Sequence, residues 1–283
     1  MEAKPLKILD SLEDSIETFL SDYESKMPSA NQEIYNELEE FLGTLKRRAD
    51  GTIKASVDNL KLVDKYRATL DKAIGNGSYT DATKEFIGTF KETSGFVNNY
   101  FGEIVNTFNS NNALYQEILK SNVESTVQSL LGSGLDANFK EPVIKILKDS
   151  IINGSDTKGA RQALTDFIIG SKDVDPKLTR YVKQVSNDSI RQYNRNYTKV
   201  ISDDLNLSHY FFKGTKIKDT RTFCAARVGK YFTKKEVEGW ASKEWAGKNT
   251  ATTKATIFTL VGGYGCRHDL IPVSKELYDK FNK

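Results

Sequence analysis

The sequence predicts a mainly α-helical protein: an elongated N-terminal helical region followed by a small, compact α+β domain. Up to about residue 205, apolar residues recur at spacings of three and four, which is the period of amphipathic helices. Beyond that point the period shifts toward two, and aromatic, glycine and cysteine residues become denser, as in short strands and turns. The charge also changes sign. Residues 206–283 hold 15 Lys and Arg against 7 Asp and Glu, a net +8, whereas residues 1–205 hold 26 against 31, a net −5.

The first 154 residues are predicted to form a helical region that carries no recognisable motif. The apolar periodicity and the intervening turn-forming residues predict helices over 4–26, 31–49, 53–74, 79–108, 114–131 and 139–152. The clearest of the predicted ends is at Gly75-Asn76-Gly77. Many Asn, Ser and Thr residues lie inside these segments, so their stability is expected to come mainly from tertiary packing.

Residues 155–205 are predicted to contain two better-defined helices. Ser155-Asp156 is suited to cap the first, and Gly170 is suited to the left-handed conformation just past its end. Asp175-Pro176 supplies an N-cap followed by a proline at the first helical position. A single long helix is therefore expected from there to about residue 205.

Residues 206–283 are predicted to form the α+β domain. A strand is expected at 209–213, and Thr233 with Glu236 forms a capping box at the start of a helix. Residues 247–256 are almost all small or polar and predict an exposed loop. A strand over 266–273, entered through Gly262-Gly263, and a terminal helix capped by Ser274 complete the domain.

Composition excludes several classes of protein. The chain has 283 residues, of which 38% are hydrophobic and 28% charged, as in ordinary globular proteins with a prior of two domains. The first fifteen residues lack the apolar stretch of a secretory signal. No window approaches the roughly 18 apolar residues of a transmembrane helix, so no membrane anchor is expected. Two cysteines are too few for a disulfide-stapled secreted scaffold, and synthesis in the cytoplasm is expected.

An ordered set of short motifs runs through the C-terminal part of the chain. Its members are Asp219, Arg221, Cys224, Arg227 and Gly229, then Trp240 and Trp245, then Gly262, Gly263, Cys266 and His268. In combination with the helical stretch from Gly159 to Gln184, this set resembles the phage Mu F-like family. Members of that family are minor head, or head morphogenesis, proteins of tailed bacteriophages. The resemblance covers about residues 155–283.

The resemblance implies a structural component of the virion, in the head or at the portal vertex, and it implies no reaction. The expected partners are the portal protein, the major capsid protein or both, together with packaged DNA. The expected roles are head assembly, DNA packaging or delivery. The chain is accordingly predicted to be made in the host cytoplasm, to have no catalytic residues, and to need no resident cofactor.

Cys224, Cys266 and His268 form a candidate metal cluster. If Cys266 and His268 lie on one strand, their spacing places both side chains on the same face, and Cys224 then completes three ligands suited to zinc. A structural zinc site needs a fourth ligand, which Asp219 or His209 could supply. The resemblance weakens this interpretation, because Arg227 and Val228 stand where a further ligand would be sought. A Cys224–Cys266 bridge and two buried thiols are the other interpretations.

The remaining motif residues have structural interpretations. Arg221 follows Asp219 at the start of a turn, and its guanidinium is expected to form an ion pair with a carboxylate. Trp240, Trp245, Phe223 and Tyr264 are expected to fill a core rather than stack on nucleotides. The segment from Gly262 to Gly265 lacks the lysine and hydroxyl residue of a phosphate loop and predicts a backbone bend.

Two other functions remain as alternatives. A hydrolase would use Cys224 as nucleophile and His268 or His209 as base, although no known nucleophile motif surrounds the cysteine. A nucleic-acid-binding module would use the +8 charge and interspersed aromatic residues of 206–283 to contact packaged DNA.

Overall fold

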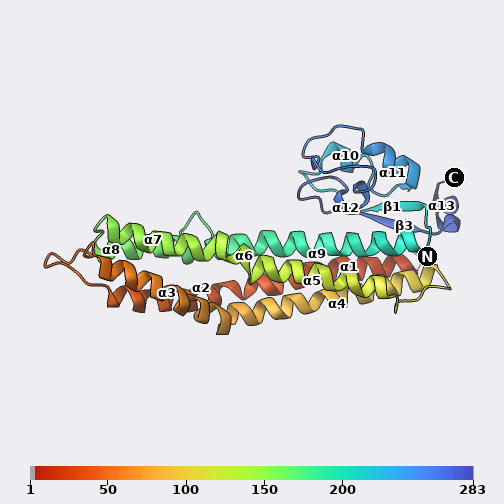
Figure 1. The fold of residues 1–283 in the computed structure, drawn as a ribbon. Coiled ribbons are helices and arrows are strands. Elements are labelled where there is room, and N and C mark those ends of the chain that lie inside the picture. Colours follow the sequence, from red (N-terminus) through yellow and green to blue (C-terminus); the bar gives the residue numbers. More distant parts are fainter. Residues whose placement is uncertain (1–3, 283) are drawn as a thin grey trace. The chain divides into compact units, whose positions relative to one another are not determined.

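The computed structural model describes residues 4–282 and confirms the predicted fold class, with long helices followed by a small α+β region (Figure 1). The helices of the N-terminal part are α1 Lys4–Ser25, α2 Met27–Thr44, α3 Val57–Asn76, α4 Ser78–Ile104, α5 Ala113–Leu130, α6 Ser133–Leu135, the π-helical turn η1 Asp136–Lys140, α7 Glu141–Ile152, α8 Thr157–Ile168 and α9 Lys177–Asp204. In the C-terminal part, the elements are β1 His209–Lys213, α10 Thr222–Ala225, β2 Tyr231–Thr233, α11 Lys234–Trp240, α12 Ile257–Leu260, β3 Asp269–Val273 and α13 Lys275–Phe281.

The chain forms two compact units that are discontinuous in sequence. The first comprises Met1–Ile16, Phe90–Asn122 and Asp188–Lys283, and the second comprises Glu17–Thr89 and Val123–Asn187. Helices α1, α4, α5 and α9 therefore each contribute residues to both units. The predicted boundaries near residues 154 and 205 remain predictions, based on sequence pattern and charge.

The second unit is helical, and its core follows the predicted apolar periodicity. Helix α2 buries residues that recur at spacings of three and four, among them Ile34, Leu38 and Phe41. Phe41 stacks on Tyr66 of α3 with ring centroids 4.2 Å apart. Because such aromatic pairs stabilise beyond the area they bury, these contacts help to fix how the helices pack.

Helix ends in the second unit agree with the predictions where a cap fixes them. Helix α3 ends at Asn76 as predicted, and Asp156 caps α8 by accepting a hydrogen bond from the Gly159 amide at 2.6 Å. Gly170 has a φ of 88°, the left-handed conformation for which glycine is suited. Long helix α9 begins at Lys177, one residue later than predicted, because Pro176 precedes the helix instead of occupying its first position.

Four predicted helices had wrong bounds. The helix predicted over 79–108 ends at Ile104. The helix predicted over 31–49 ends at Thr44 and begins four residues early, because proline favours the first turn of a helix and Pro28 occupies that turn of α2. The helix predicted from 53 begins at Val57, since Ser56 caps it and Ile53 pairs with Arg47 in an isolated bridge. The helix predicted over 139–152 corresponds to α7, which begins at Glu141. The two residues before it belong to the π-helical turn η1.

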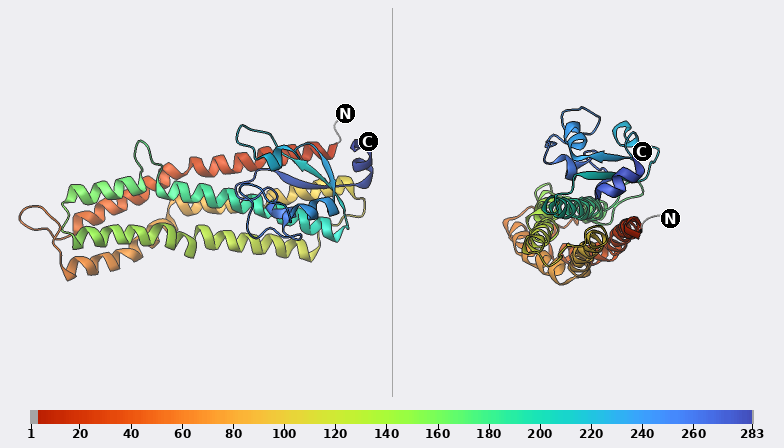
Figure 2. Two further views of the ribbon diagram at one scale, coloured as in Figure 1. Left: turned by 90° about the horizontal axis from the view of Figure 1, so that it is seen from above. Right: turned by 90° about the vertical axis from the view of Figure 1, so that its right-hand side faces the viewer.

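The first unit contains a three-stranded antiparallel sheet in the order β2-β1-β3. The central strand β1 was predicted with its observed bounds, and its alternation buries Tyr210 and Phe212 on one face. The short strand β2 was not predicted. Every residue of β3 is buried, and the Tyr100 hydroxyl donates a hydrogen bond to the Pro272 carbonyl. Figure 2 shows the sheet beside the C-terminal part of α9.

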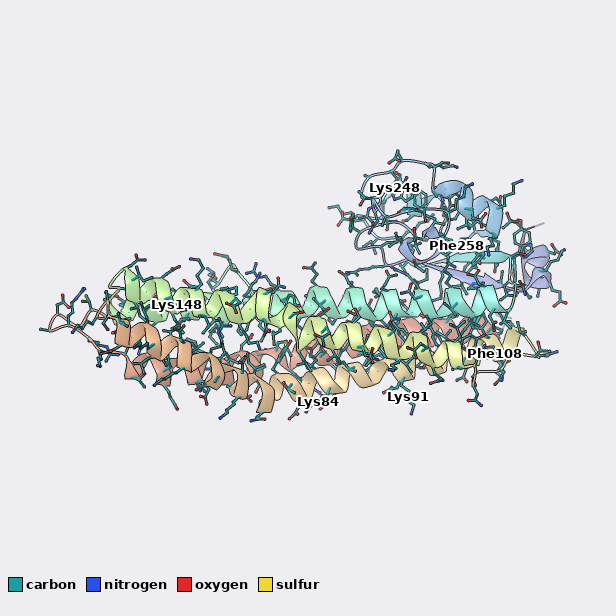
Figure 3. The ribbon with its side chains drawn as sticks, viewed as in Figure 1. Lys84, Lys91, Phe108, Lys148, Lys248 and Phe258 are labelled. Carbon is teal, nitrogen blue, oxygen red and sulfur yellow. The ribbon has the colours of Figure 1, made fainter. Side chains whose placement is uncertain are left out.

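Short helices and loops surround this sheet. The predicted capping box is present, with the Thr233 hydroxyl accepting from the Glu236 amide and the Glu236 carboxylate accepting from the Thr233 amide. Ser274 caps α13, as predicted. Lys248 lies in the predicted exposed loop, whereas Phe258 of α12 belongs to the core (Figure 3). The core is aromatic: Phe212, Phe223 and Phe232 all pack on Trp240.

Across residues 4–282, no helix combines the length and the apolar character needed to cross a membrane.

Candidate functional site

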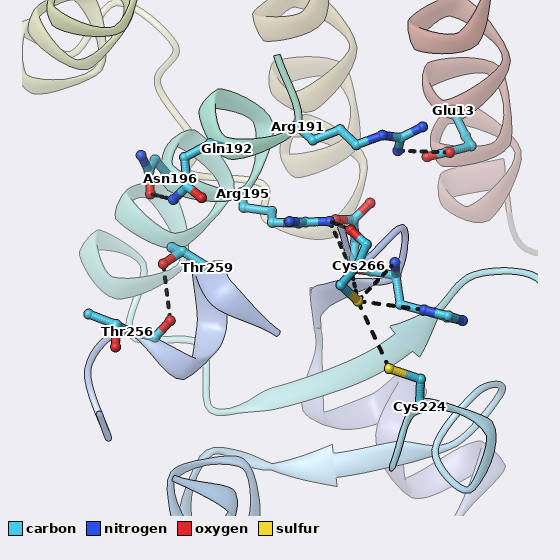
Figure 4. A network of polar contacts seen from close by, with 11 residues as sticks. Glu13, Arg191, Gln192, Arg195, Asn196, Cys224, Thr256, Thr259 and Cys266 are labelled. Atoms are coloured by element: carbon cyan, nitrogen blue, oxygen red, sulfur yellow. Dashed lines mark hydrogen bonds and ion pairs between the residues drawn. The ribbon is translucent and has the colours of Figure 1, made fainter. Parts of the chain in front are cut away.

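The structure brings Cys224, Cys266 and His268 together in the core of the α+β region. Cys224 lies on α10, and Cys266 and His268 lie in the segment between α12 and β3. The two sulfurs are 4.0 Å apart, and Cys266 Sγ is 3.6 Å from His268 Nδ1 (Figure 4). One candidate ligand atom from each residue falls within a group no wider than 4.8 Å. All three side chains are buried, so the cluster has little access to solvent.

The prediction that Cys266 and His268 lie on a strand was wrong. Strand β3 begins at Asp269, where its ladder with β1 ends opposite Lys213. Cys266 instead lies in a turn in which its amide donates to the Gly263 carbonyl, and the His268 amide contacts Cys266 Sγ at 3.4 Å. The two side chains converge because the backbone folds around the sulfur, and strand alternation has no part in it.

The predicted bend before this turn is confirmed by its dihedral angles. Gly263 and Gly265 have φ values of 95° and 62°, and the buried residue Val261 has a φ of 45°. A positive φ is unusual for a β-branched residue and carries strain. A Cβ at Gly262 would collide with the sulfurs of Cys224 and Cys266. The backbone at residue 262 can therefore lie in direct contact with the two sulfurs only because that residue is glycine.

Arg221 binds the carbonyl groups of this turn. The prediction that it pairs with a carboxylate was wrong. Its Nη2 donates to the Tyr264 carbonyl at 2.5 Å and its Nη1 to the Gly262 carbonyl at 3.4 Å. The indole nitrogen of Trp245 also donates to the Gly262 carbonyl, at 2.9 Å. Carbonyls of a tight turn have no partners in secondary structure, so side-chain donors satisfy them.

The aromatic residues were predicted correctly, except for Tyr264. Phe223 and Trp240 are buried, and Trp245 packs partly buried against them with its ring centroid 3.9 Å from that of Phe223. Arg227 lies over the Phe223 ring, with its guanidinium carbon 3.7 Å from the ring centroid. Tyr264 is 57% exposed, because the bend turns its side chain away from the core.

The motif residues Asp219 and Gly229, and the candidate ligand His209, lie outside the cluster. Asp219 is exposed in the turn before α10, and Gly229 closes the turn after it with a φ of 80°. His209 lies on β1, where its ring is 4.4 Å from that of Tyr278. Neither Asp219 nor His209 belongs to the group of candidate ligands found in residues 4–282.

Arg195 of α9 is the functional residue that sequence reasoning missed. Its Nε pairs with Asp269 at 2.7 Å, and its Nη2 donates to the carbonyls of Cys266 and His268 at 2.5 and 3.2 Å (Figure 4). Both charged side chains are nearly buried. The only signal in the sequence was the spacing of four between Arg191 and Arg195, which places them on one helix face.

The two thiols have unequal acidities. The hydrogen bond from Cys224, the hydrogen bonds of His268 and the charge of Arg195 lower the pKa of Cys266. The same sulfur contact, together with burial, raises the pKa of Cys224. The two thiols share one hydrogen bond, so they titrate as a pair, and the ionised form is favoured at Cys266.

Comparisons with descriptions of protein families, with curated proteins and with solved structures found no match to this chain.

Proposed function

We propose that the chain is a structural minor head protein of a tailed bacteriophage, associated with the portal or capsid. The observation that carries the proposal is where the motif residues lie. Cys224, Trp240, Gly262, Cys266 and His268 are all buried. Residues that build an interior specify a fold, whereas a catalytic constellation must reach a substrate.

The arginines of the motif set support the same proposal. Arg221 binds carbonyls of the turn, and Arg227 packs its guanidinium on aromatic rings. These contacts use the planar guanidinium to fix local structure. A motif set devoted to folding is what a structural protein requires, and the resemblance to minor head proteins supplies the assembly in which it would act.

The experiment is to locate the chain in purified virions. An epitope-tagged copy, produced from the phage or prophage that encodes the chain, should sediment with assembled heads at fewer copies than the major capsid protein. Cryo-electron microscopy of these particles should then show it at the portal vertex or on the inner capsid surface. The proposal fails if the chain is made in the infected cell but is absent from the heads.

A DNA-contacting role is the second candidate, and exposed basic residues favour it. Lys216 and Lys218 lie in the exposed loop after β1, and Lys254 and Arg267 are also exposed. Within residues 4–282, none of these four forms an ion pair with an acidic side chain. Such cations are free to neutralise phosphates and release counterions.

A salt titration tests this second candidate. If the exposed cations contact phosphates, the affinity of the full chain for duplex DNA should fall steeply as salt rises, and Lys216→Gln with Lys218→Gln should flatten that slope. Lys275→Gln is the matched control, because Lys275 already pairs with Asp279. An affinity that does not change with salt would argue against phosphate contacts.

A further inference from the structure

The Cys224, Cys266 and His268 cluster has the donor set of a thiophilic metal ion. Thiolate sulfur and imidazole nitrogen together are the ligands that zinc prefers in proteins. The three residues come from two segments that are 42 positions apart, and no acidic side chain joins their group within residues 4–282. This composition sets the cluster apart from the acidic surface groups that are common in proteins without a metal.

The spacing of the donor atoms matches a zinc centre better than a disulfide. Tetrahedral zinc with Zn–S bonds of about 2.3 Å holds two sulfurs about 3.8 Å apart, and a sulfur and an imidazole nitrogen about 3.6 Å apart. The observed separations are 4.0 Å between the sulfurs and 3.6 Å between Cys266 Sγ and His268 Nδ1. A disulfide would require the sulfurs to approach to about 2.05 Å.

The histidine is buried beside the sulfurs. His268 is only 6% exposed, and its Nδ1 lies 3.6 Å from Cys266 Sγ. A metal bound at Nδ1 would account for a polar ring in this position. The other ring nitrogen, Nε2, has no hydrogen-bond partner, which costs free energy that a metal at Nδ1 would not relieve. The other histidine, His209, contacts the ring of Tyr278 and the hydroxyl of Ser208 and does not belong to the candidate ligand group of residues 4–282.

Charge supports the same assignment. Two thiolates and a neutral imidazole carry a charge that a divalent cation cancels, whereas both thiolates cannot ionise together in a buried site without a cation. Arg195 already engages Asp269 and the carbonyls of Cys266 and His268. By binding these carbonyls, Arg195 orients the segment that carries Cys266 and His268. Residues that hydrogen-bond to metal ligands commonly orient them in this way.

We propose that Cys224, Cys266 and His268 bind one zinc ion, with a water molecule as the fourth ligand. The ion ties α10 to the segment before β3 and so closes the core of the α+β region. The fourth ligand is a single water molecule enclosed with the ion in this buried site, because neither Asp219 nor His209 belongs to the group of candidate ligands in residues 4–282. This inference does not depend on the virion role, because it concerns the isolated chain.

The test uses the purified full-length chain and Co²⁺ as a spectroscopic substitute for zinc. The wild-type chain should bind one Co²⁺ and show the intense visible and thiolate charge-transfer absorption of tetrahedral coordination, and Zn²⁺ should abolish that absorption. Cys224→Ser, Cys266→Ser and His268→Ala should each lose most of the absorption. His209→Ala is the matched control and should retain it, since it removes the only other histidine.

A second measurement on the wild-type chain guards against variants that fail to fold. Both tryptophans of the sequence, Trp240 and Trp245, lie in this core, and Trp245 donates to the Gly262 carbonyl beside the sulfurs. Removal of metal with a chelator should therefore shift the tryptophan fluorescence and lower the melting temperature, and added Zn²⁺ should restore both. The proposal is overturned if the wild-type chain holds no metal and binds no Co²⁺. It is equally overturned if its mass under non-reducing conditions shows a Cys224–Cys266 disulfide.

Discussion

Two regions of this protein build their interiors in different ways. The helical unit of residues 17–89 and 123–187 buries residues that repeat along each helix, such as Ile34, Leu38 and Phe41 of α2. The α+β region instead assembles its core from scattered residues, including Cys224, Trp240 and Cys266, that loops and turns carry inward. In a periodic helical core, neighbouring residues of the same helix make similar contacts. In a core assembled from loops and turns, each buried residue makes contacts that no neighbour in sequence repeats. Substitutions should therefore act more locally, and with sharper consequences, in the α+β region.

The largest effect is expected at the buried ion pair between Arg195 and Asp269. Arg195→Met would leave the Asp269 carboxylate nearly buried without its cation, and would strip a donor from two carbonyls. Breaking such a pair costs about 3–5 kcal/mol, measured as the free energy of unfolding in denaturant. The double variant Arg195→Met with Asp269→Leu should recover part of the loss.

The exposed pair of Lys275 and Asp279 provides the control for that prediction. Their side chains are 73% and 50% exposed, so Lys275→Met should cost less than about 1 kcal/mol. Equal losses in the Arg195 and Lys275 variants would mean that the buried pair has no special role in joining α9 to the sheet.

A matched pair of phenylalanines compares the two cores directly. Phe139 in the helical unit and Phe212 in the α+β region are both fully buried, and truncation to alanine costs about 3–5 kcal/mol in each case. Hydrogen exchange should show that Phe212→Ala lowers protection mainly in β1, β2 and β3. Phe139→Ala should act mainly on η1, α7 and α8. If both variants lowered protection everywhere alike, the two units would unfold as one, and the distinction between the cores would have no energetic meaning.

A smaller effect is expected at the helix caps. Asp156 caps α8 in the helical unit, and Thr233 caps α11 in the α+β region. Replacing either residue by alanine should lower the free energy of unfolding by about 1 kcal/mol. Substitution by serine should preserve most of the stability. A loss as large as that for the phenylalanines would show that the cap also positions neighbouring elements.

The smallest effect is expected from pH at a surface pair of the helical unit. Hydrogen bonds from Arg161 lower the pKa of Glu39 from its ordinary value of 4.5. A carboxyl whose pKa is lower in the folded state adds stability above its unfolded pKa, and that stability disappears as the pH falls through the folded pKa. The difference in unfolding free energy between wild type and Arg161→Met should thus shrink once the pH falls below 4.5. A difference that grew on acidification would contradict the assigned pair.

The candidate site was only partly readable from the sequence. The motif set singled out Cys224, Cys266 and His268, and the structure gathers them. Their geometry was predicted for the wrong reason, because the backbone turn that brings Cys266 to His268 depends on Gly263 and Gly265 rather than on a strand. Arg195 was missed because an arginine on a long polar helix has no sequence feature that distinguishes a buried partner from solvent.

By itself, the sequence determined the elements whose cause is local. The apolar period produced the long helices, Asp156 and Pro176 placed helix starts, and alternation gave β1 its bounds. Only the tertiary structure decided which residues meet. The short strand β2 has too few residues for a pattern and exists because β1 pairs with it. Likewise, the contact of two sulfurs with one imidazole depends on chain segments that are distant in sequence, and no local preference encodes such a meeting.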